Sequence, residues 1–162
     1  YFVRFIKGNE KDRNTINDAT LRLADSYFVL KDYNAALENY NRIISFNASG
    51  EDYALFQRGM IQGLQGQNDA KIATHQSLLK QYPKSNYADD SGFEIAYTYF
   101  VKGDFDKAKS DLGTLIEKYP RSSYVPRALE TIGLVQYNLG LGCDLPQPIF
   151  YMQKCPHRLL LQ

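Results

Sequence analysis

The sequence repeats itself with a period of 35 to 37 residues. Each unit opens on a small residue, at Ala24, Gly59, Ala96 and Gly133. Seven residues later comes a turn position, at Lys31, Gly66, Gly103 and Gly140. Glycine adopts the left-handed conformation that ends a helix without a Cβ clash, so the turn position predicts a helix end. A period of this length is typical of arrays in which one helical unit stacks on the next.

We expect two helices in each unit, because the apolar residues recur at helical spacing. The expected helices cover residues 14–30, 33–46, 51–65, 68–82, 87–102, 105–119 and 123–139. Asp32 and Asp104 follow turns and suit helix caps. Pro83 and Pro120 lie where a second helix has to stop.

The composition excludes several classes of protein. Lys plus Arg number 19 and Asp plus Glu 18, a formal charge of +1, which argues against a nucleic-acid binder. No run of about 18 apolar residues exists, so we expect no membrane-spanning segment. Both cysteines, Cys143 and Cys155, follow residue 142, so the main body is neither a disulfide scaffold nor a cysteine-based zinc site.

The pattern over residues 1–140 resembles the tetratricopeptide repeat family. The third unit matches the family pattern most fully, through Ala96, Tyr99, Gly103, Phe105, Ala108, Leu112, Leu115 and Pro120. The second unit departs most, with Gln62, Asn68, Lys71 and His75 at pattern positions. The resemblance implies an all-α fold, a right-handed α-solenoid of antiparallel helix pairs. The repeat also predicts that Tyr99→Ala costs roughly 3 kcal/mol, the range for deleting a buried aromatic side chain.

The repeat frame divides the chain into an array over 1–140 and a tail over 141–162. The array is expected to hold a partial repeat at 1–13, full repeats at about 17–50, 52–85 and 89–122, and a half repeat at 126–140. In the tail, Pro146 and Pro148 would break a second helix. The tail is therefore a separate terminal segment, a disordered end or a non-native extension, or its leucines cover the last helix.

The repeat junctions carry a narrower resemblance. YPKSNYADD and YPRSSYVPRAL are similar to junctions in bacterial cell-envelope proteins. Examples are the lipoprotein of the outer-membrane β-barrel assembly machinery and the Tol–Pal-associated periplasmic repeat protein. This similarity implies a periplasmic or outer-membrane-associated location, with the cytoplasm as the alternative.

The family resemblance implies a protein–protein interaction scaffold that binds a peptide or partner protein through a concave groove, with no cofactor. Partner contacts in the family come mainly from the first helix of each pair. The equivalent aromatic and methionine positions are Phe28, Tyr53, Phe56, Met60, Phe93, Tyr97, Phe100 and Tyr137. Exposed apolar patches of this kind tend to be interaction sites. Two alternatives stay open: the rings are buried against one another, or the array is a structural spacer or self-assembly module that packs on another copy.

The sequence indicates no enzyme and no metal site. We find no phosphate loop and no nucleophile–base motif. Cys143, Cys155 and His157 match no standard zinc spacing. His75 shares a helix face with Lys71, and is either a pH-sensitive contact or a surface or partly buried substitute for an aromatic residue.

Two acidic pairs lie at predicted helix starts, Glu51–Asp52 and Asp89–Asp90. Adjacent residues on a helix point in different directions, so neither pair suits acid–base catalysis. Acidic side chains in a first turn complement the helix dipole, which is the interpretation that we favour.

Overall fold

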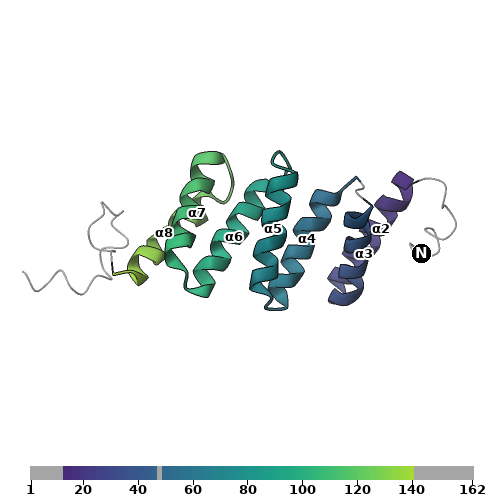
Figure 1. Cartoon of the computed structure of the whole chain (residues 1–162), viewed down its shortest axis with the longest axis horizontal. Helices are drawn as coiled ribbons and strands as arrows, with labels where there is room; N and C mark the ends of the chain where they lie inside the picture. The colour runs from purple at the N-terminus through teal and green to yellow at the C-terminus, as the bar shows by residue number, and fades with distance from the viewer. Residues whose placement is uncertain (1–12, 47–48, 141–162) are drawn as a thin grey trace, which may run out of the picture. The chain divides into compact units, whose positions relative to one another are not determined.

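The structure is a computed structural model that describes residues 13–46 and 49–140. Its helices are α2 (Arg13–Val29), α3 (Tyr33–Ser45), α4 (Glu51–Leu64), α5 (Asn68–Gln81), α6 (Ala88–Lys102), α7 (Phe105–Lys118) and α8 (Val125–Asn138) (Figure 1). Each lies within two residues of its predicted range, and the all-α fold class is confirmed. The partial repeat before residue 13 and the tail 141–162 lie outside the described residues.

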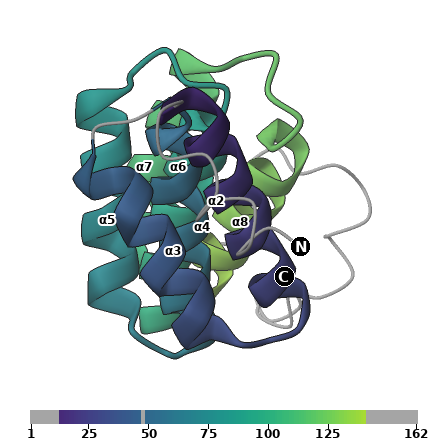
Figure 2. The same ribbon diagram turned by 90° about the vertical axis from the view of Figure 1, so that its right-hand side faces the viewer.

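The chain forms two compact units, which divide within α6: an N-terminal unit, Tyr1–Ile95, and a C-terminal unit, Ala96–Gln162. We call α2, α4, α6 and α8 the first helices, and α3, α5 and α7 the second helices. In the N-terminal unit, α2 packs on α3, α3 on α4, and α4 on α5. Figure 2 shows α2 and α3 side by side, with α5 on the α3 side of this unit. In the C-terminal unit, α7 packs on α8.

The turn that ends each first helix has the same left-handed backbone. Its φ is +61° at Lys31, +74° at Gly66, +80° at Gly103 and +72° at Gly140. In each case the turn N–H donates to the carbonyl three residues earlier, at 2.9 to 3.1 Å. The predicted turn positions are therefore confirmed. Lys31 alone of the four carries a Cβ in this conformation, which disfavours L-residues by roughly 1–2 kcal/mol.

Helices α3 and α7 begin directly after the predicted cap residues, and α5 and α7 end just before the predicted prolines. The Asp32 carboxylate caps α3 by accepting a hydrogen bond from the Ala35 N–H at 3.2 Å. Asp104 occupies the equivalent position before α7, where it pairs with the Lys107 ammonium at 2.8 Å. Helices α5 and α7 end two residues before their prolines, because the residue before proline disfavours the helical conformation.

Small residues let the paired helices approach each other. Ala24, Ala36, Ala96 and Ala108 are all fully buried. In the N-terminal unit the core cluster combines two of these alanines with Tyr40, Ile43, Ala54 and Ile61. Tyr40 has the largest fully buried side chain among the described residues, and a ring of this size buries a large apolar area.

In the second full repeat, a glycine replaces the phenylalanine of the other full repeats, and a lysine side chain fills the space that is left. Phe28 and Phe100 occupy one position of the first and third repeats, and the second repeat has Gly63 there. A Cβ on Gly63 would lie 2.9 Å from Cδ of Lys71, so the lysine stem fills the space near this glycine. The Lys71 ammonium forms an ion pair with Glu94, and both side chains are largely buried.

Candidate functional site

The eight residues predicted to line the groove differ in exposure. Six are half-buried: Phe28, Tyr53, Phe56, Met60, Tyr97 and Phe100. Tyr137 is 62% exposed, whereas Phe93 is 0% exposed. The prediction that Phe93 lines the groove is wrong, because a fully buried ring has no exposed area left for a partner to contact. For that position the internal-packing alternative is right.

The half-buried rings of the N-terminal unit form a continuous series of contacts. The Tyr53 ring lies 5.4 Å from the Tyr87 ring, measured between centroids. Tyr87 stacks on Phe56 at 5.3 Å and 20°, and Phe56 lies 5.6 Å from the His75 ring. On the other side, Tyr53 meets the buried Tyr40 edge-on at 6.3 Å and 82°. Helices α3, α4 and α5 and the loop before α6 thus contribute to one aromatic cluster.

Tyr87 belongs to this cluster although the sequence analysis did not include it. Tyr87 begins the predicted helix 87–102, but in the structure it lies in the loop just before α6, one residue ahead of the helix. The repeated junctions YPKSNY and YPRSSY place a tyrosine at the same point, Tyr87 and Tyr124. That periodic tyrosine was the signal that could have found it.

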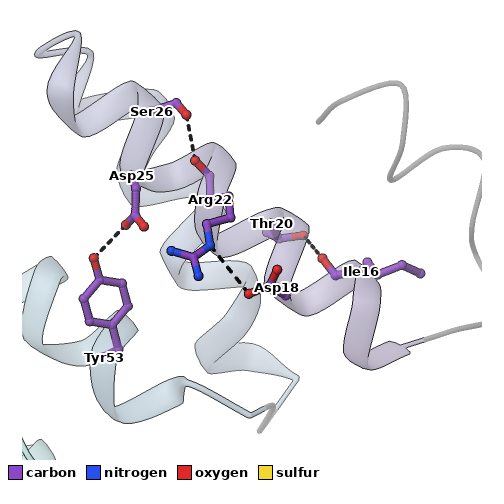
Figure 3. Close-up of polar contacts among 7 residues, drawn as sticks. All are labelled: Ile16, Asp18, Thr20, Arg22, Asp25, Ser26 and Tyr53. Carbon is purple, nitrogen blue, oxygen red and sulfur yellow. Dashed lines mark hydrogen bonds and ion pairs between the residues drawn. The ribbon is translucent and has the colours of Figure 1, made fainter. Parts of the chain in front are cut away.

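Asp25 on α2 holds two tyrosine hydroxyls of this cluster. Its Oδ1 accepts a hydrogen bond from the Tyr53 hydroxyl at 2.8 Å (Figure 3) and one from the Tyr40 hydroxyl at 2.7 Å. The Gln57 amide donates to the Tyr53 oxygen at 2.8 Å. Burial, followed by the hydrogen bond to Asp25, raises the pKa of both hydroxyls. They therefore remain protonated donors, and the Tyr53 ring is fixed in orientation.

The charges of three carboxylates act on the Tyr87 hydroxyl. Burial raises the pKa of its hydroxyl most, and the charges of Asp52, Asp90 and Asp25 raise it further. Asp52 accepts hydrogen bonds from the Ser85 hydroxyl at 2.6 Å and from the Tyr53 N–H at 2.9 Å. Asp52 and Asp90 lie in first turns, as predicted. Acidic side chains from α2, α4 and α6 thus act on one tyrosine.

A second set of rings lies in the C-terminal unit. The Phe100 ring is 5.9 Å from the Tyr97 ring and 5.9 Å from the Phe105 ring. The guanidinium carbon of Arg127 on α8 lies 5.2 Å from the Tyr97 ring centroid. This distance allows a cation–π interaction, which is worth about 0.5–1 kcal/mol at an exposed site.

His75 is a core residue rather than a surface contact. The side chain is fully buried, and its Nδ1 lies 3.2 Å from the Ser91 hydroxyl oxygen. Burial, with a smaller contribution from the Lys71 charge, lowers the pKa of His75 to about 3. The imidazole is therefore neutral at neutral pH and packs on Phe56 as an aromatic ring would, which is the substitute role considered above.

The described residues contain neither a candidate metal-binding group nor a candidate membrane-spanning helix. Within residues 13–46 and 49–140, no group of three or more His, Cys, Asp or Glu side chains is arranged to hold a metal ion. No helix in the described part of the chain is long and apolar enough to cross a membrane. Cys143, Cys155 and His157 lie outside the described residues.

Known proteins with the same arrangement are helical repeat proteins. A family model described as tetratricopeptide repeat matches residues 18–46, 53–85 and 90–122. The crystal structure of MamA matches with a TM-score of 0.69 and 20% identity, over 87% of this chain and 78% of that chain. A tetratricopeptide repeat protein from Parabacteroides merdae matches with a TM-score of 0.62 and 19% identity, over 86% of this chain and 50% of that chain. At these identities the likeness concerns the fold. Comparison with curated proteins gives no significant match.

Proposed function

Since this chain belongs to the tetratricopeptide repeat family, we propose that it is a scaffold that binds a protein or peptide partner through its first helices. Proteins of this family bind other proteins, and the proposal assigns the chain no catalytic step. The observation that carries it is the aromatic cluster of the N-terminal unit, whose rings Tyr53, Phe56 and Tyr87 remain half-buried rather than enclosed.

The cluster has properties that suit partner binding. Rigid tyrosine and phenylalanine rings lose little conformational entropy when a partner covers them, so they make effective anchors. The Tyr53 ring is already fixed through its hydrogen bond to Asp25. Preorganisation of this kind lowers the cost of binding. Phe28 and Met60, which are also half-buried on first helices, add apolar area of the type found at adaptable interfaces.

Selection from a random peptide library displayed on phage tests this proposal. Selected peptides should bind the full chain, and Phe56→Ala should weaken that binding at least tenfold, because an anchor ring is lost. Phe46→Ala is the matched control, since Phe46 is 67% exposed and ends a second helix. Fluorescence anisotropy gives the affinities, and circular dichroism checks that both variants are folded. Equal binding by a folded Phe56→Ala variant would reject the proposal.

Self-assembly is a second candidate, and the exposed apolar side chains of α8 favour it. Leu129, Leu134 and Tyr137 are all exposed on this helix. Apolar side chains of this number on one helix can pack on another copy. Light scattering over a concentration series distinguishes the two candidates. A strict monomer rejects self-assembly, whereas a dimer that Leu134→Lys dissociates supports it.

We also propose a location in the bacterial cell envelope, on the resemblance of the junctions YPKSNYADD and YPRSSYVPRAL to those of envelope proteins. Cell fractionation of the source organism with an antibody against this chain tests the location. Recovery in the periplasmic or outer-membrane fraction is the expected result. Recovery with the cytoplasmic proteins would support the alternative.

A further inference from the structure

We infer that the partner presents arginine or lysine side chains, spaced by apolar residues, to the first helices of the N-terminal unit. This inference rests on the proposed function and names the chemistry of the segment that is bound. Two observations carry it: the charge on the first helices of this unit, and the surroundings of the Tyr53 and Tyr87 rings.

The near-neutral total charge of the chain conceals an uneven distribution. Over α2, α4 and the part of α6 within the N-terminal unit, acidic residues number seven and basic residues three. The acidic ones are Asp18, Asp25, Glu51, Asp52, Asp89, Asp90 and Glu94, and the basic ones are Arg13, Arg22 and Arg58. The second helices α3 and α5 instead carry two acidic and three basic residues: Glu38 and Asp69, with Arg42, Lys71 and Lys80. The acidic excess is therefore confined to the first helices.

Among the described residues, two of these carboxylates, Asp25 and Asp52, are held by hydrogen bonds from groups that carry no charge. Arg22 pairs with Asp18, and Lys71 pairs with Glu94. Asp25 and Asp52 instead accept hydrogen bonds from neutral groups, namely tyrosine and serine hydroxyls and a backbone N–H. Each of these two carboxylates is half-buried, so its charge is less screened than that of a fully solvated side chain. A cation bound on this surface would be attracted by both the Asp25 and the Asp52 carboxylate.

The tyrosine rings add a second attraction for the same kind of group. An aromatic face attracts a cation, and a neighbouring carboxylate strengthens the attraction by its own charge. The charged groups that act on Tyr53 and Tyr87 include Asp25 and Asp52. The C-terminal unit gives an internal example, because the Arg127 guanidinium lies over Tyr97 at 5.2 Å. An incoming arginine would interact in the same way with Tyr53 or Tyr87.

Apolar residues on the same helices favour a partner segment that also carries apolar side chains. Phe28, Phe56 and Met60 are half-buried and lie on α2 and α4, as Asp25 and Asp52 do. A segment whose side chains alternate between basic and apolar satisfies carboxylates and rings together. A phosphorylated or acidic segment would instead meet like charge, which costs binding energy.

Three synthetic peptides of equal length test the inference. The first alternates arginine and leucine, the second alternates glutamine and leucine, and the third alternates glutamate and leucine. Fluorescence anisotropy with the full chain at low and high salt gives the affinities. The arginine peptide should bind at least tenfold more tightly than the glutamine peptide at low salt, and this advantage should shrink as salt rises. The glutamate peptide should bind most weakly.

Two variants that each remove three negative charges test whether the first helices, rather than the net charge, attract the arginine peptide. The triple variant Asp25→Asn, Asp52→Asn and Asp90→Asn removes three charges from the first helices and keeps the side-chain size. The control variant Glu38→Gln, Asp69→Asn and Glu117→Gln removes three charges from the second helices. Arginine-peptide affinity should fall about tenfold in the first variant and less than twofold in the control. Thermal unfolding confirms that both variants are folded.

The outcomes separate this inference from the proposed function. If the glutamine peptide binds as tightly as the arginine peptide, and Phe56→Ala weakens both, the binding surface stands and the basic partner is rejected. If both triple variants lose affinity equally, binding follows net charge, and the inference is again rejected. If no peptide binds, the inference is overturned while the library selection still decides the proposed function. A first-helix variant that fails to fold is replaced by Asp52→Asn alone, whose amide oxygen can still accept the Tyr53 N–H, with the same expected direction.

Discussion

A Cβ atom on Gly59 would lie 2.5 Å from the Nε2 atom of His75, so the two residues occupy complementary space. The first repeat has Ala24 and Tyr40 at the same two positions. In the second repeat the smaller glycine allows the imidazole to lie directly against the α4 backbone. The exchange of alanine for glycine and of tyrosine for histidine is therefore coupled.

The replacement Gly59→Ala should destabilise the protein by about 1–3 kcal/mol, because the added methyl group overpacks the core against a ring that Phe56 and Ser91 hold in place. Gly133→Ala is the matched control, since Gly133 has the same repeat position on α8 and nothing lies within 4 Å of its Cβ. The control should be stabilised by about 0.5–1 kcal/mol through backbone entropy. Urea denaturation followed by circular dichroism measures both. Equal shifts in the two variants would contradict the close approach.

Acid should destabilise the fold through His75. Burial lowers the pKa of His75 to about 3 in the folded state, whereas the unfolded chain binds the same proton near pH 6.5. The stability is therefore complete above about pH 6.5 and falls as the pH drops toward 3. At pH 5 the loss should be about 2 kcal/mol.

The difference between wild type and His75→Leu isolates this contribution. Leucine is the residue at the equivalent position of the third repeat, Leu112. Urea denaturation at pH 7.5 and pH 5 should show a smaller acid loss in the variant than in the wild type. An identical pH dependence in both proteins would mean that His75 is accessible to solvent protons when folded.

The two tyrosines Tyr40 and Tyr99 should differ in their contribution to stability. Tyr40 is fully buried and donates a hydrogen bond to Asp25, so Tyr40→Ala should cost about 3–5 kcal/mol. Tyr99 is only half-buried, and the Lys107 ammonium lies 5.1 Å from its ring centroid. We therefore expect Tyr99→Ala to cost about 1–2 kcal/mol, less than the sequence alone suggested. Thermal and urea unfolding give the ranking, and the reverse order would refute it.

The buried ion pair between Lys71 and Glu94 gives a further prediction. Glu94→Gln should cost about 2–3 kcal/mol, because the largely buried Lys71 ammonium loses its counter-charge. Asp18→Asn is the control, since it breaks the exposed pair with Arg22 and should cost about 0–1 kcal/mol. Chemical denaturation of the two variants side by side measures the difference. A cost near zero for Glu94→Gln would show that water reaches Lys71.

The turn at Lys31 should be improvable. Lys31→Gly should stabilise the protein by about 1 kcal/mol, because glycine adopts the left-handed φ of +61° without a Cβ penalty. Lys31→Ala keeps the Cβ and removes the charge, so it should gain nothing. Midpoints of urea denaturation distinguish the two variants. A gain from both would indicate that the charge, rather than the backbone, limits stability here.

Features that recur with the repeat were predictable from the sequence. The turn positions, the helix bounds and the buried Ala24, Ala36, Ala96 and Ala108 follow from spacing, because each copy repeats the same local chemistry. The periodic pattern contains what the units share, so it predicts which helix a residue lies in and which face of that helix it occupies.

Features that depend on a single unit were not predictable in this way. The repeat frame gives Phe56 and Phe93 equivalent positions, yet only Phe56 stays half-buried. The contact between Tyr53 and Tyr87, and the link from Tyr53 to Asp25, join different repeats. Such contacts depend on how one unit packs on the next, which the spacing within a unit does not determine. The acidic surface was also missed, because a total charge near zero gives no information on where charges lie.

The ion pair between Lys71 and Glu94 favours one order of neighbouring repeats over others. Lys71 belongs to the second repeat, and Glu94 stands two residues before the small residue that opens the third. At that position the other units have Arg22, Gln57 and Thr131. A recombination event that placed any of those units after the second repeat would leave the lysine facing a cation or a neutral side chain. Although the array looks modular, its second repeat therefore favours the third as its downstream neighbour over the other units of this chain.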